Sequence, residues 1–459
     1  MNQKLFVSVL LPPMIAYQSA SRAMSTYYAP AQHESTLTHS KIWLPTNLSS
    51  MILKLKLPEK IQPYLTSAAL LKLLLLPFAL SFIAALILIR PFRVVKFFKV
   101  NPWRIGHLLI EIEIARLNSL NDSFIKRRKR LVIYYFPERE PANRYLQVKW
   151  KSLLPSIEGH WGWLLFHLAE RISMKLFITP ILVRDKDGLL SKLPGSLGFS
   201  KTESEFGEKF LQSVGCRNRK FVCLMVRDSA YLDTIRSDKS FSYYEYRDSK
   251  IMTFIPAADM LTQNGYTVFR MGQIVKDKLI SDNPNIIDYA TNGMRTEFLD
   301  LFLGANCSFF VSTGTGIDTV AQVFRRPMLY VNVVGFYEDI LLNEYMFYPK
   351  IHKDASSLKE LSLREIAKRG LANEINRQRF EQENTIVEDL SPQEITDAIS
   401  EMLARTTGSF VPSDKEQVLQ AKALHIFKTE SSLQGEFNRG FLRGEFSSCF
   451  LNKYPNFLD

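Results

Sequence analysis

Five consecutive small residues stand between a strand-like run and a helix-like run in the segment FFVSTGTGIDTVAQVFRRPMLYVN, residues 309–332. At a strand-to-helix turn, glycine lets the backbone approach a ligand closely, and the first N–H groups of the helix have no partner within it. Those donors and the positive end of the helix dipole suit a phosphate or diphosphate. We therefore predict that this turn binds a phosphate group. It consists of Ser312, Thr313, Gly314, Thr315 and Gly316.

The turn matches neither of the two common phosphate-binding motifs. No lysine follows its glycines, as it would in a P-loop, and the residue three positions after Gly316 is Thr319 rather than glycine. Small residues at such a turn can also serve only to allow tight packing. The motif by itself therefore leaves ligand binding and packing open.

Three arginines are predicted near the same edge of the fold. Arg227 directly follows an apolar run, Arg247 precedes a helix-like segment, and Arg270 ends a second apolar run. A guanidinium group can bind phosphate oxygens through two parallel hydrogen bonds. We predict that the three side chains converge on the phosphate; the alternative is that they are solvated surface residues.

One histidine lies where a general base would be useful. His107 follows Gly106 at the start of an apolar, helix-like segment that also contains Glu111. The ordinary pKa of histidine suits it to accept a proton from a hydroxyl group near neutral pH. We predict His107 as the base and Glu111 as the second candidate. The alternative is a histidine that only satisfies the backbone at a turn near a membrane.

Metal and disulfide chemistry find little support in the sequence. The four cysteines and seven histidines do not cluster at metal-ligand spacing, and no Asp-x-Asp pair stands near the turn. We expect no metal ion, no cofactor other than the co-substrate, and no disulfide framework.

The elements that would position these residues alternate between strands and helices. At 459 residues the chain is long enough for two or three domains. Strands that alternate with helices of 10–15 residues form parallel sheets, which bind ligands beyond the carboxyl ends of their strands. Residues 219–405 are therefore predicted to form a Rossmann-like domain. Its predicted strands are 221–226, 266–271, 307–312 and 327–333, and its predicted helical stripes are 251–261, 294–305 and 317–324.

The remainder of the chain is less regular. Leu131–Phe136 predicts a strand, Trp150–Lys175 a packed helical region, and Leu193–Ser200 a loop that connects two domains. We assign residues 100–200 to an N-terminal domain. We assign residues 406–459 to a C-terminal tail that packs back on the fold.

An apolar segment precedes both domains. Ala68–Ile89 contains 22 residues with one charge, Lys72. A helix of this length covers about 33 Å, enough to cross a bilayer. The alternative is a buried core helix, but such helices are rarely apolar on all sides over this length. We predict a single transmembrane helix at residues 68–89, preceded by an irregular extension, residues 1–67.

Positive charge follows the apolar segment. Residues 91–151 contain 14 Lys/Arg and 5 Asp/Glu, with the run Lys126–Arg130 at their centre. Beside a membrane segment, attraction to anionic lipid headgroups explains this run better than nucleic-acid binding does; a solvated loop is the other alternative. The charge excess after the segment favours the cytoplasmic side for the catalytic part.

Longer stretches carry a family resemblance. KFVCLMVRDSAYL, YRDSKIMTFIPAADMLTQNGYTVFRMG and FLGANCSFFVSTGTGIDTVAQVFRRPMLYVN resemble a glycosyltransferase family associated with bacterial surface-polysaccharide (O-antigen or capsule) biosynthesis. RIGHL, YYFPEREPANRYLQVKWK and the closing GEFNRGFLRGEFSSCFLNKYPNFL look similar to the same family. The resemblance covers about Asn101–Asp459, and the extension and apolar segment before it depart from the family.

The resemblance implies a GT-B-like α/β fold, in which two Rossmann-like domains face each other across a cleft. The nucleotide sugar would bind mainly to the C-terminal domain, with its diphosphate against Arg227 and residues 312–316. We expect a membrane-anchored, metal-independent glycosyltransferase that moves a sugar from a nucleotide-diphosphate donor to a hydroxyl of a lipid-linked or growing glycan. The alternatives are a nucleotide-sugar epimerase or pyruvyl transferase on the same fold, and a non-catalytic, membrane-tethered polysaccharide assembly factor.

Overall fold

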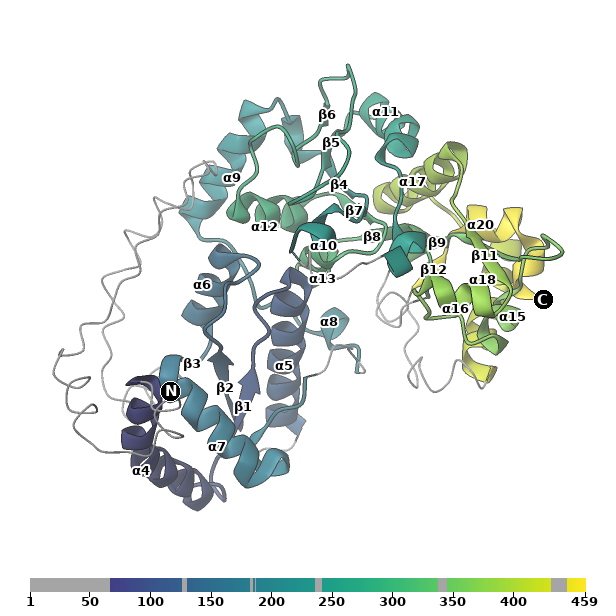
Figure 1. Ribbon diagram of the computed structural model, residues 1–459. Helices are drawn as coiled ribbons and strands as arrows, with labels where there is room; N and C mark the ends of the chain where they lie inside the picture. Colours follow the sequence, from purple (N-terminus) through teal and green to yellow (C-terminus); the bar gives the residue numbers. More distant parts are fainter. Residues whose placement is uncertain are drawn as a thin grey trace. The chain divides into compact units, whose positions relative to one another are not determined.

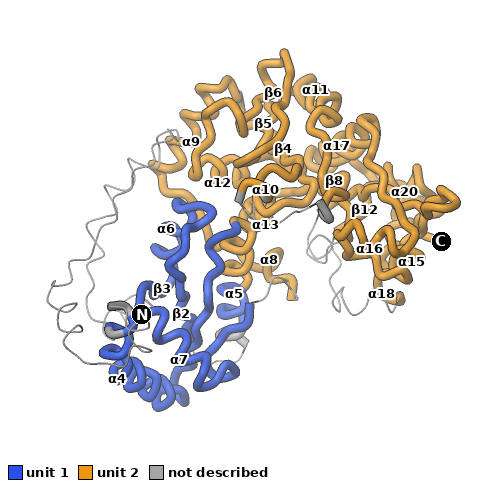
Figure 2. Tube along the Cα trace, in the orientation of Figure 1, with its two compact units in different colours: residues 1–23, 31–104, 115–182 blue, residues 24–30, 105–114, 183–459 orange. Residues whose placement is uncertain are grey.

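The computed structural model describes residues 67–125, 130–181, 185, 187–235, 242–336, 345–430 and 444–459. The predicted extension before residue 67 and most of the basic run, residues 126–129, lie outside the described residues. The described chain divides into two compact units (Figure 2). Unit 1 contains residues 67–104 and 115–181, and unit 2 contains residues 105–114 and the chain from residue 185 onward.

Unit 1 is built on a small parallel sheet with the strand order β1-β2-β3 (Figure 1). Strand β2 is buried along most of its length because the sheet is covered by apolar helices. The elements are α4 (Ser67–Leu88), β1 (Val94–Lys99), the later part of α5 (Ile105–Ile125), β2 (Arg130–Phe136), α6 (Arg144–Leu153), β3 (Ser156–Glu158) and α7 (Gly159–Phe177).

The helical region predicted at Trp150–Lys175 contains a strand. Helix α6 ends at Leu153, and Pro155 follows, which cannot continue a helix because it lacks an N–H group. The chain then forms β3, which pairs with β2, and turns into α7 at Gly159, where φ is +67°. The prediction of one helical region was wrong at this point.

Helix α4 coincides with the predicted apolar segment. It spans 22 residues and contains Pro77. Its stretch Leu71–Leu88 has a mean hydropathy of 2.5, so among the described helices it is the one long and apolar enough to cross a membrane.

Unit 2 contains a seven-stranded sheet with the order β12-β9-β8-β7-β4-β5-β6, in which every neighbouring pair is parallel. This confirms the predicted α/β class with a parallel sheet. The strands are β4 (Phe221–Met225), β5 (Thr267–Arg270), β6 (Ile286–Ile287), β7 (Phe309–Ser312), β8 (Met328–Val333), β9 (Tyr345–Pro349) and β12 (Glu445–Phe446). A separate antiparallel pair is formed by β10 (Ile351–Asp354) and β11 (Thr385–Glu388).

The helices of unit 2 begin with the first part of α5, Ile105–Ile114. They continue with α8 (Leu189–Lys192), α9 (Lys201–Ser213), α10 (Ala230–Ile235), α11 (Ile255–Gln263), α12 (Glu297–Asn306), α13 (Thr319–Val323), α15 (Leu363–Lys368), α16 (Arg377–Gln382), α17 (Pro392–Thr407), α18 (Asp414–Thr429) and α20 (Ser448–Lys453). Short 3-10 turns are η2 (Arg217–Arg219), η3 (Ser242–Arg247), η4 (Ile251–Phe254), η5 (Gly316–Asp318) and η6 (Pro455–Leu458).

The predicted helical stripe 251–261 is split in two. Its first turn is the 3-10 turn η4, and α11 begins only at Ile255, with Pro256 in its first turn. Proline is favoured in the first turn of a helix but not inside one, so Pro256 marks the true start of α11.

Candidate functional site

The strand order of unit 2 reverses between β4 and β7. From β4 the chain adds β5 and β6 on one side, and then returns to add β7, β8 and β9 on the other. Met225 at the end of β4 lies opposite Ser312 at the end of β7. In open parallel sheets, ligands bind beyond the strand ends where the order reverses. Both the predicted phosphate turn and Arg227 therefore lie at the position favoured for a ligand.

Hydrogen bonds within the turn hold it around a buried carboxylate. Asp318 accepts at one oxygen from the hydroxyl of Ser312 and from the N–H of Thr315, both at 2.8 Å. The N–H of Gly314 donates to the Ser312 hydroxyl oxygen at 3.0 Å. Part of the donor set predicted for a phosphate is thus already used inside the turn. Asp318 was missed from the sequence, although its spacing from Thr315 follows the capping-box pattern.

Burial controls the protonation of Asp318. The residue is 3% exposed, and removal from water raises the pKa of its carboxyl to about 6, against the hydrogen bonds from the turn and the positive charge of Arg247. A carboxylate here opposes a bound diphosphate, so any anion at this turn depends on the neighbouring cations.

The raised pKa of Asp318 predicts a pH-dependent stability. The folded state holds the Asp318 proton more tightly than the unfolded state does. Protonated Asp318 therefore contributes to the free energy of unfolding fully below its ordinary pKa of 3.8, and this contribution is lost as the pH rises through about 6. The difference between the two pKa values corresponds to about 3 kcal/mol of folding free energy at most. We expect the melting temperature of the unmodified chain to fall relative to that of Asp318→Asn between pH 4.5 and 7. A difference that stays constant across this range in thermal unfolding would contradict the raised pKa.

Two of the predicted arginines contact the turn. The backbone N–H of Arg227 donates to the Thr313 hydroxyl oxygen at 2.8 Å, and its guanidinium pairs with Asp248 at 2.5 Å. The guanidinium of Arg247 donates to the carbonyl oxygen of Gly314 at 3.0 Å. A diphosphate bound at the turn would replace or extend these contacts.

Arg270 is held elsewhere. Its side chain is 1% exposed and pairs with Asp288 at 3.0 Å, while it also donates to the carbonyl oxygen of Asp277 at 3.1 Å. It ends β5, which neighbours β4 rather than β7. The structure therefore does not bring Arg270 to the turn, and we leave it out of the proposed site.

A further cation reaches the same neighbourhood. The Lys350 ammonium donates to the carbonyl oxygen of Asp248 at 2.8 Å and pairs with Asp389 at 2.5 Å. Burial lowers the pKa of Lys350, and Asp389 opposes this. Burial also raises the pKa of Asp248, while Arg227 lowers it. The sequence did not identify Lys350 or Asp248 because each lies in an ordinary loop or strand end with no motif around it.

The start of α5 packs against the phosphate turn within unit 2. A Cβ atom at Gly106 would lie 3.2 Å from Cα and 3.3 Å from the carbonyl oxygen of Gly316, so the two backbones meet closely. Gly316 therefore has a packing role as well as its predicted ligand role. The contact brings the backbone of Gly106, the residue before the predicted base His107, against the predicted phosphate turn.

His107 and Glu111 form a hydrogen-bonded pair through the Nδ1 atom of the histidine. The histidine side chain is 31% exposed and that of Glu111 is 3% exposed. An ionised carboxylate only accepts hydrogen bonds, so beside it a neutral imidazole carries its proton on Nδ1, and Nε2 is the basic nitrogen. The arrangement fits a general base with an orienting carboxylate.

A second buried carboxylate fixes the position of α5. Glu113 is fully buried and accepts from the guanidinium of Arg325 at 2.8 Å and from the N–H of Ser196 at 3.2 Å. Arg325 also donates to the carbonyl oxygen of Val323 at 2.6 Å, at the end of α13. Since α13 follows the turn, this network holds the first part of α5, residues 105–114, to the turn within unit 2. Ser196 lies in the predicted inter-domain loop, which is part of unit 2.

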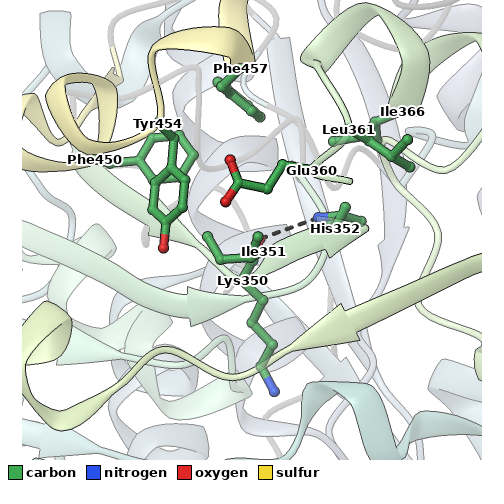
Figure 3. Close-up of a pocket in the computed structure, with 9 residues that line it drawn as sticks. All are labelled: Lys350, Ile351, His352, Glu360, Leu361, Ile366, Phe450, Tyr454 and Phe457. Carbon is green, nitrogen blue, oxygen red and sulfur yellow. Dashed lines mark hydrogen bonds between the residues drawn. The ribbon is translucent and has the colours of Figure 1, made fainter. Parts of the chain in front are cut away.

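A pocket adjoins this site and shares Lys350 with it. Its volume is roughly 270 Å³ with the solvent at its mouth, and Figure 3 shows the side chains around it. His352 is buried there, and burial lowers its pKa to about 4, so its imidazole is neutral near pH 7. None of the residues predicted from the sequence lines the pocket, which is formed by Lys350, Ile351, His352, Glu360, Leu361, Ile366, Phe450, Tyr454 and Phe457.

Comparison with known proteins gives distant similarities. No protein-family model matches the chain. No curated protein matches it either. Among solved structures, Escherichia coli ADP-heptose lipopolysaccharide heptosyltransferase II is 12% identical, covering 68% of this chain and 99% of that one, with a TM-score of 0.36. A glycosyl transferase family 9 protein from Veillonella parvula is 9% identical, covering 68% and 98%, with a TM-score of 0.39.

A third structure, the E. coli heptosyltransferase WaaC with ADP-2-deoxy-2-fluoro heptose, is 13% identical. The match covers 56% of this chain and 92% of that one, with a TM-score of 0.26. The chain is similar to these glycosyltransferases at low identity.

Proposed function

We propose that the chain is a glycosyltransferase that moves a sugar from a nucleotide-diphosphate donor to a hydroxyl group of a lipid-linked or growing surface glycan. One observation carries the proposal: a glycine-containing turn, Arg227 and Arg247 are in contact where the strand order reverses, and Gly106, beside His107, packs on that turn. The turn and the two arginines suit the binding of an anionic leaving group, and His107 suits the removal of a proton from an acceptor hydroxyl.

In the reaction, the acceptor oxygen forms a bond to the anomeric carbon while the bond from that carbon to the diphosphate oxygen breaks. The negative charge grows on the diphosphate, and the guanidinium groups of Arg227 and Arg247 stabilise it together with hydroxyl and N–H groups of residues 312–316. Because these groups are set in place by the sheet, they need little rearrangement as the charge develops.

The acceptor proton passes to Nε2 of His107. Glu111 holds the Nδ1 proton and stabilises the imidazolium that forms. Glu111, first predicted as an alternative base, therefore takes the role of a positioning residue.

The chain would need no metal ion and no cofactor beyond the nucleotide sugar, so treatment with a chelator should leave activity unchanged.

The remaining predictions complete the proposal. Residues 219–405 would bind the donor, residues 100–200 would bind the acceptor, and residues 406–459 would pack back on the fold. The chain would be attached to a membrane through α4, with its catalytic part on the cytoplasmic side and a basic region, including residues 126–130, near the lipid headgroups.

Gly314→Val tests the phosphate turn. Gly314 has φ +87°, and a Cβ atom there would meet only Val333 Cγ1, at 3.8 Å, so the substitution strains the backbone of the turn by about 1–2 kcal/mol and its Cβ atom has room. We expect the variant to lose stabilisation by ADP, UDP, GDP or CMP in thermal unfolding. Gly408→Val is the matched control, because Gly408 has φ +75° with nothing within 4 Å and caps α17. Nucleotide binding by Gly314→Val that equals binding by Gly408→Val would remove the turn from the site.

Product analysis separates the alternatives. The full chain in its native membrane is incubated with labelled nucleotide sugars, with and without a lipid extract as acceptor. A transferase gives a labelled lipid or glycan only with the acceptor, whereas an epimerase converts the nucleotide sugar without it. Labelled phosphoenolpyruvate tests the pyruvyl transferase. An assembly factor without a donor site would show no nucleotide binding.

A further inference from the structure

Helix α4 has one face inside the protein. Ala79, Ile83 and Leu86 are 0%, 1% and 4% exposed, and their spacing places them on one side of the helix. They belong to the same hydrophobic core as the sheet of unit 1, represented by Val95 of β1 and Ile133 of β2. Helix α4 is thus a packed part of unit 1 and not a separate anchor.

The other face of α4 is exposed and almost entirely apolar. Leu74 is 64% exposed, Phe78 68% and Leu88 77%. The polar exception is Ser81, whose hydroxyl donates to the Pro77 carbonyl oxygen at 2.9 Å and so is satisfied within the helix. Interfaces between proteins carry a polar rim and about one hydrogen bond per 100–200 Å², which this face does not supply. Its composition suits hydrocarbon.

Helix α7 packs beside α4 and also carries exposed apolar side chains. The Lys72 ammonium lies 3.8 Å from the ring centre of Trp163. On its later part, exposed Ile172 and Met174 stand beside exposed Arg171 and Lys175. Apolar side chains next to cations are typical of segments that lie at the surface of an anionic bilayer.

A transmembrane position of α4 conflicts with this packing. If α4 crossed the bilayer, the sheet that shares its core would enter the hydrocarbon with it. That sheet is not closed: β1 and β3 are its edge strands in the order β1-β2-β3, and one isolated bridge, Phe97 with Ile178, covers only part of the outer edge of β1. Unpaired backbone groups at open sheet edges are not tolerated in lipid, where each costs several kcal/mol.

We infer that α4 does not cross the membrane, and that α4 and α7 together form a face that inserts into one leaflet of an anionic lipid bilayer. The inference replaces the single span with a one-sided attachment. It concerns the membrane attachment in the proposed function but does not depend on the transfer reaction, and its tests use no activity measurement.

The side of the membrane reached by each end of α4 tests the inference directly. Lys60→Cys and Lys99→Cys place a thiol before and after α4 in the full chain, with Cys449 replaced by serine; the other native cysteines are buried. Spheroplasts of the expressing bacterium are treated with a membrane-impermeant maleimide before and after opening, with detergent as the reference for full labelling. We expect both thiols to react from the same side. Reaction from opposite sides would establish a span and overturn the inference.

Vesicle binding tests the face itself. The purified full chain is mixed with vesicles of phosphatidylethanolamine and phosphatidylglycerol and separated by flotation. We expect Leu74→Asp/Phe78→Asp to reduce the vesicle-bound to free ratio at least tenfold. The matched control is Val411→Asp/Val418→Asp, because these valines are 83% and 66% exposed in unit 2, and it should bind as the unmodified chain does.

Two results would overturn the assignment of this face to lipid. One is unchanged flotation of Leu74→Asp/Phe78→Asp, which would mean that another part of the chain mediates binding. The other is a dimer in detergent-free solution that this double variant dissociates, which would make the face an interface between copies. Melting temperatures of the two double variants, measured in parallel, show whether unit 1 stays folded.

Discussion

His107→Ala should lower turnover by about 10²- to 10⁴-fold while leaving nucleotide binding nearly unchanged. The histidine pairs with Glu111 and its neighbour Gly106 packs on the turn that would hold the diphosphate. Removing the imidazole takes away the acceptor of the hydroxyl proton but none of the groups proposed to hold the donor. The measurement is the initial rate of labelled sugar transfer, together with the stabilisation by nucleoside diphosphates in thermal unfolding.

Glu111→Gln and His425→Ala provide the comparison for this result. An amide at position 111 can donate a hydrogen bond to Nδ1 and so favours the tautomer with its proton on Nε2, which should reduce turnover on the order of 10²-fold. His425 is exposed on α18, and its replacement should have no effect. If His107→Ala retains full turnover, the base lies elsewhere. If it loses nucleotide binding as strongly as turnover, His107 has a structural role at the turn.

Long apolar runs made much of unit 2 predictable from the sequence. The strands β4, β5, β7 and β8 lie within the predicted runs, because a parallel sheet covered on both faces selects strands that are apolar on both faces. The strand β12 has only two residues, so the sequence shows no repeating apolar pattern there that would predict a strand. It exists because Glu445 and Phe446 pair with β9, far earlier in the chain.

The candidate site was predictable only where local sequence decides position. The small residues of the turn and Arg227 follow predicted strands, so their place at the sheet edge followed from the α/β pattern. The pairing of Arg227 with Asp248 and the burial of Arg270 depend on distant parts of the chain. No periodicity encodes such contacts, which explains why three arginines were predicted to converge and two contact the turn.

The environment of α4 also depends on contacts that the sequence pattern does not encode. Composition and length are alike for a helix surrounded by lipid and for a helix half covered by a sheet and half by lipid. Only the packing of Ile83 and its neighbours in the core of unit 1 distinguishes the two cases. Sequence alone therefore favoured a span, and the fold favours a one-sided attachment.

Arg227→Ala should weaken binding of nucleoside diphosphates by about 10- to 100-fold, since a hydrogen bond to a charged group contributes about 1.5–3 kcal/mol. Arg227 is 7% exposed, lies two residues after the end of β4 and contacts Thr313 of the turn through its backbone, and we propose that its guanidinium binds the diphosphate. Arg227→Lys should recover only part of the affinity, because an ammonium group cannot form the bidentate contact. The measurement is calorimetric titration of the full chain in detergent with the nucleoside diphosphates ADP, UDP and GDP.

The partner of Arg227 provides the decisive control for that result. Arg227→Ala alone leaves the Asp248 carboxylate without its ion pair, so part of any loss could come from a destabilised site. Arg227→Met/Asp248→Asn removes both charges and should restore the melting temperature while binding stays weak. Arg379→Ala, which removes an exposed arginine paired with Glu383, should bind as the unmodified chain does. Recovery of nucleotide affinity in the double variant would show that Arg227 only neutralises Asp248 and that the diphosphate is held by other groups.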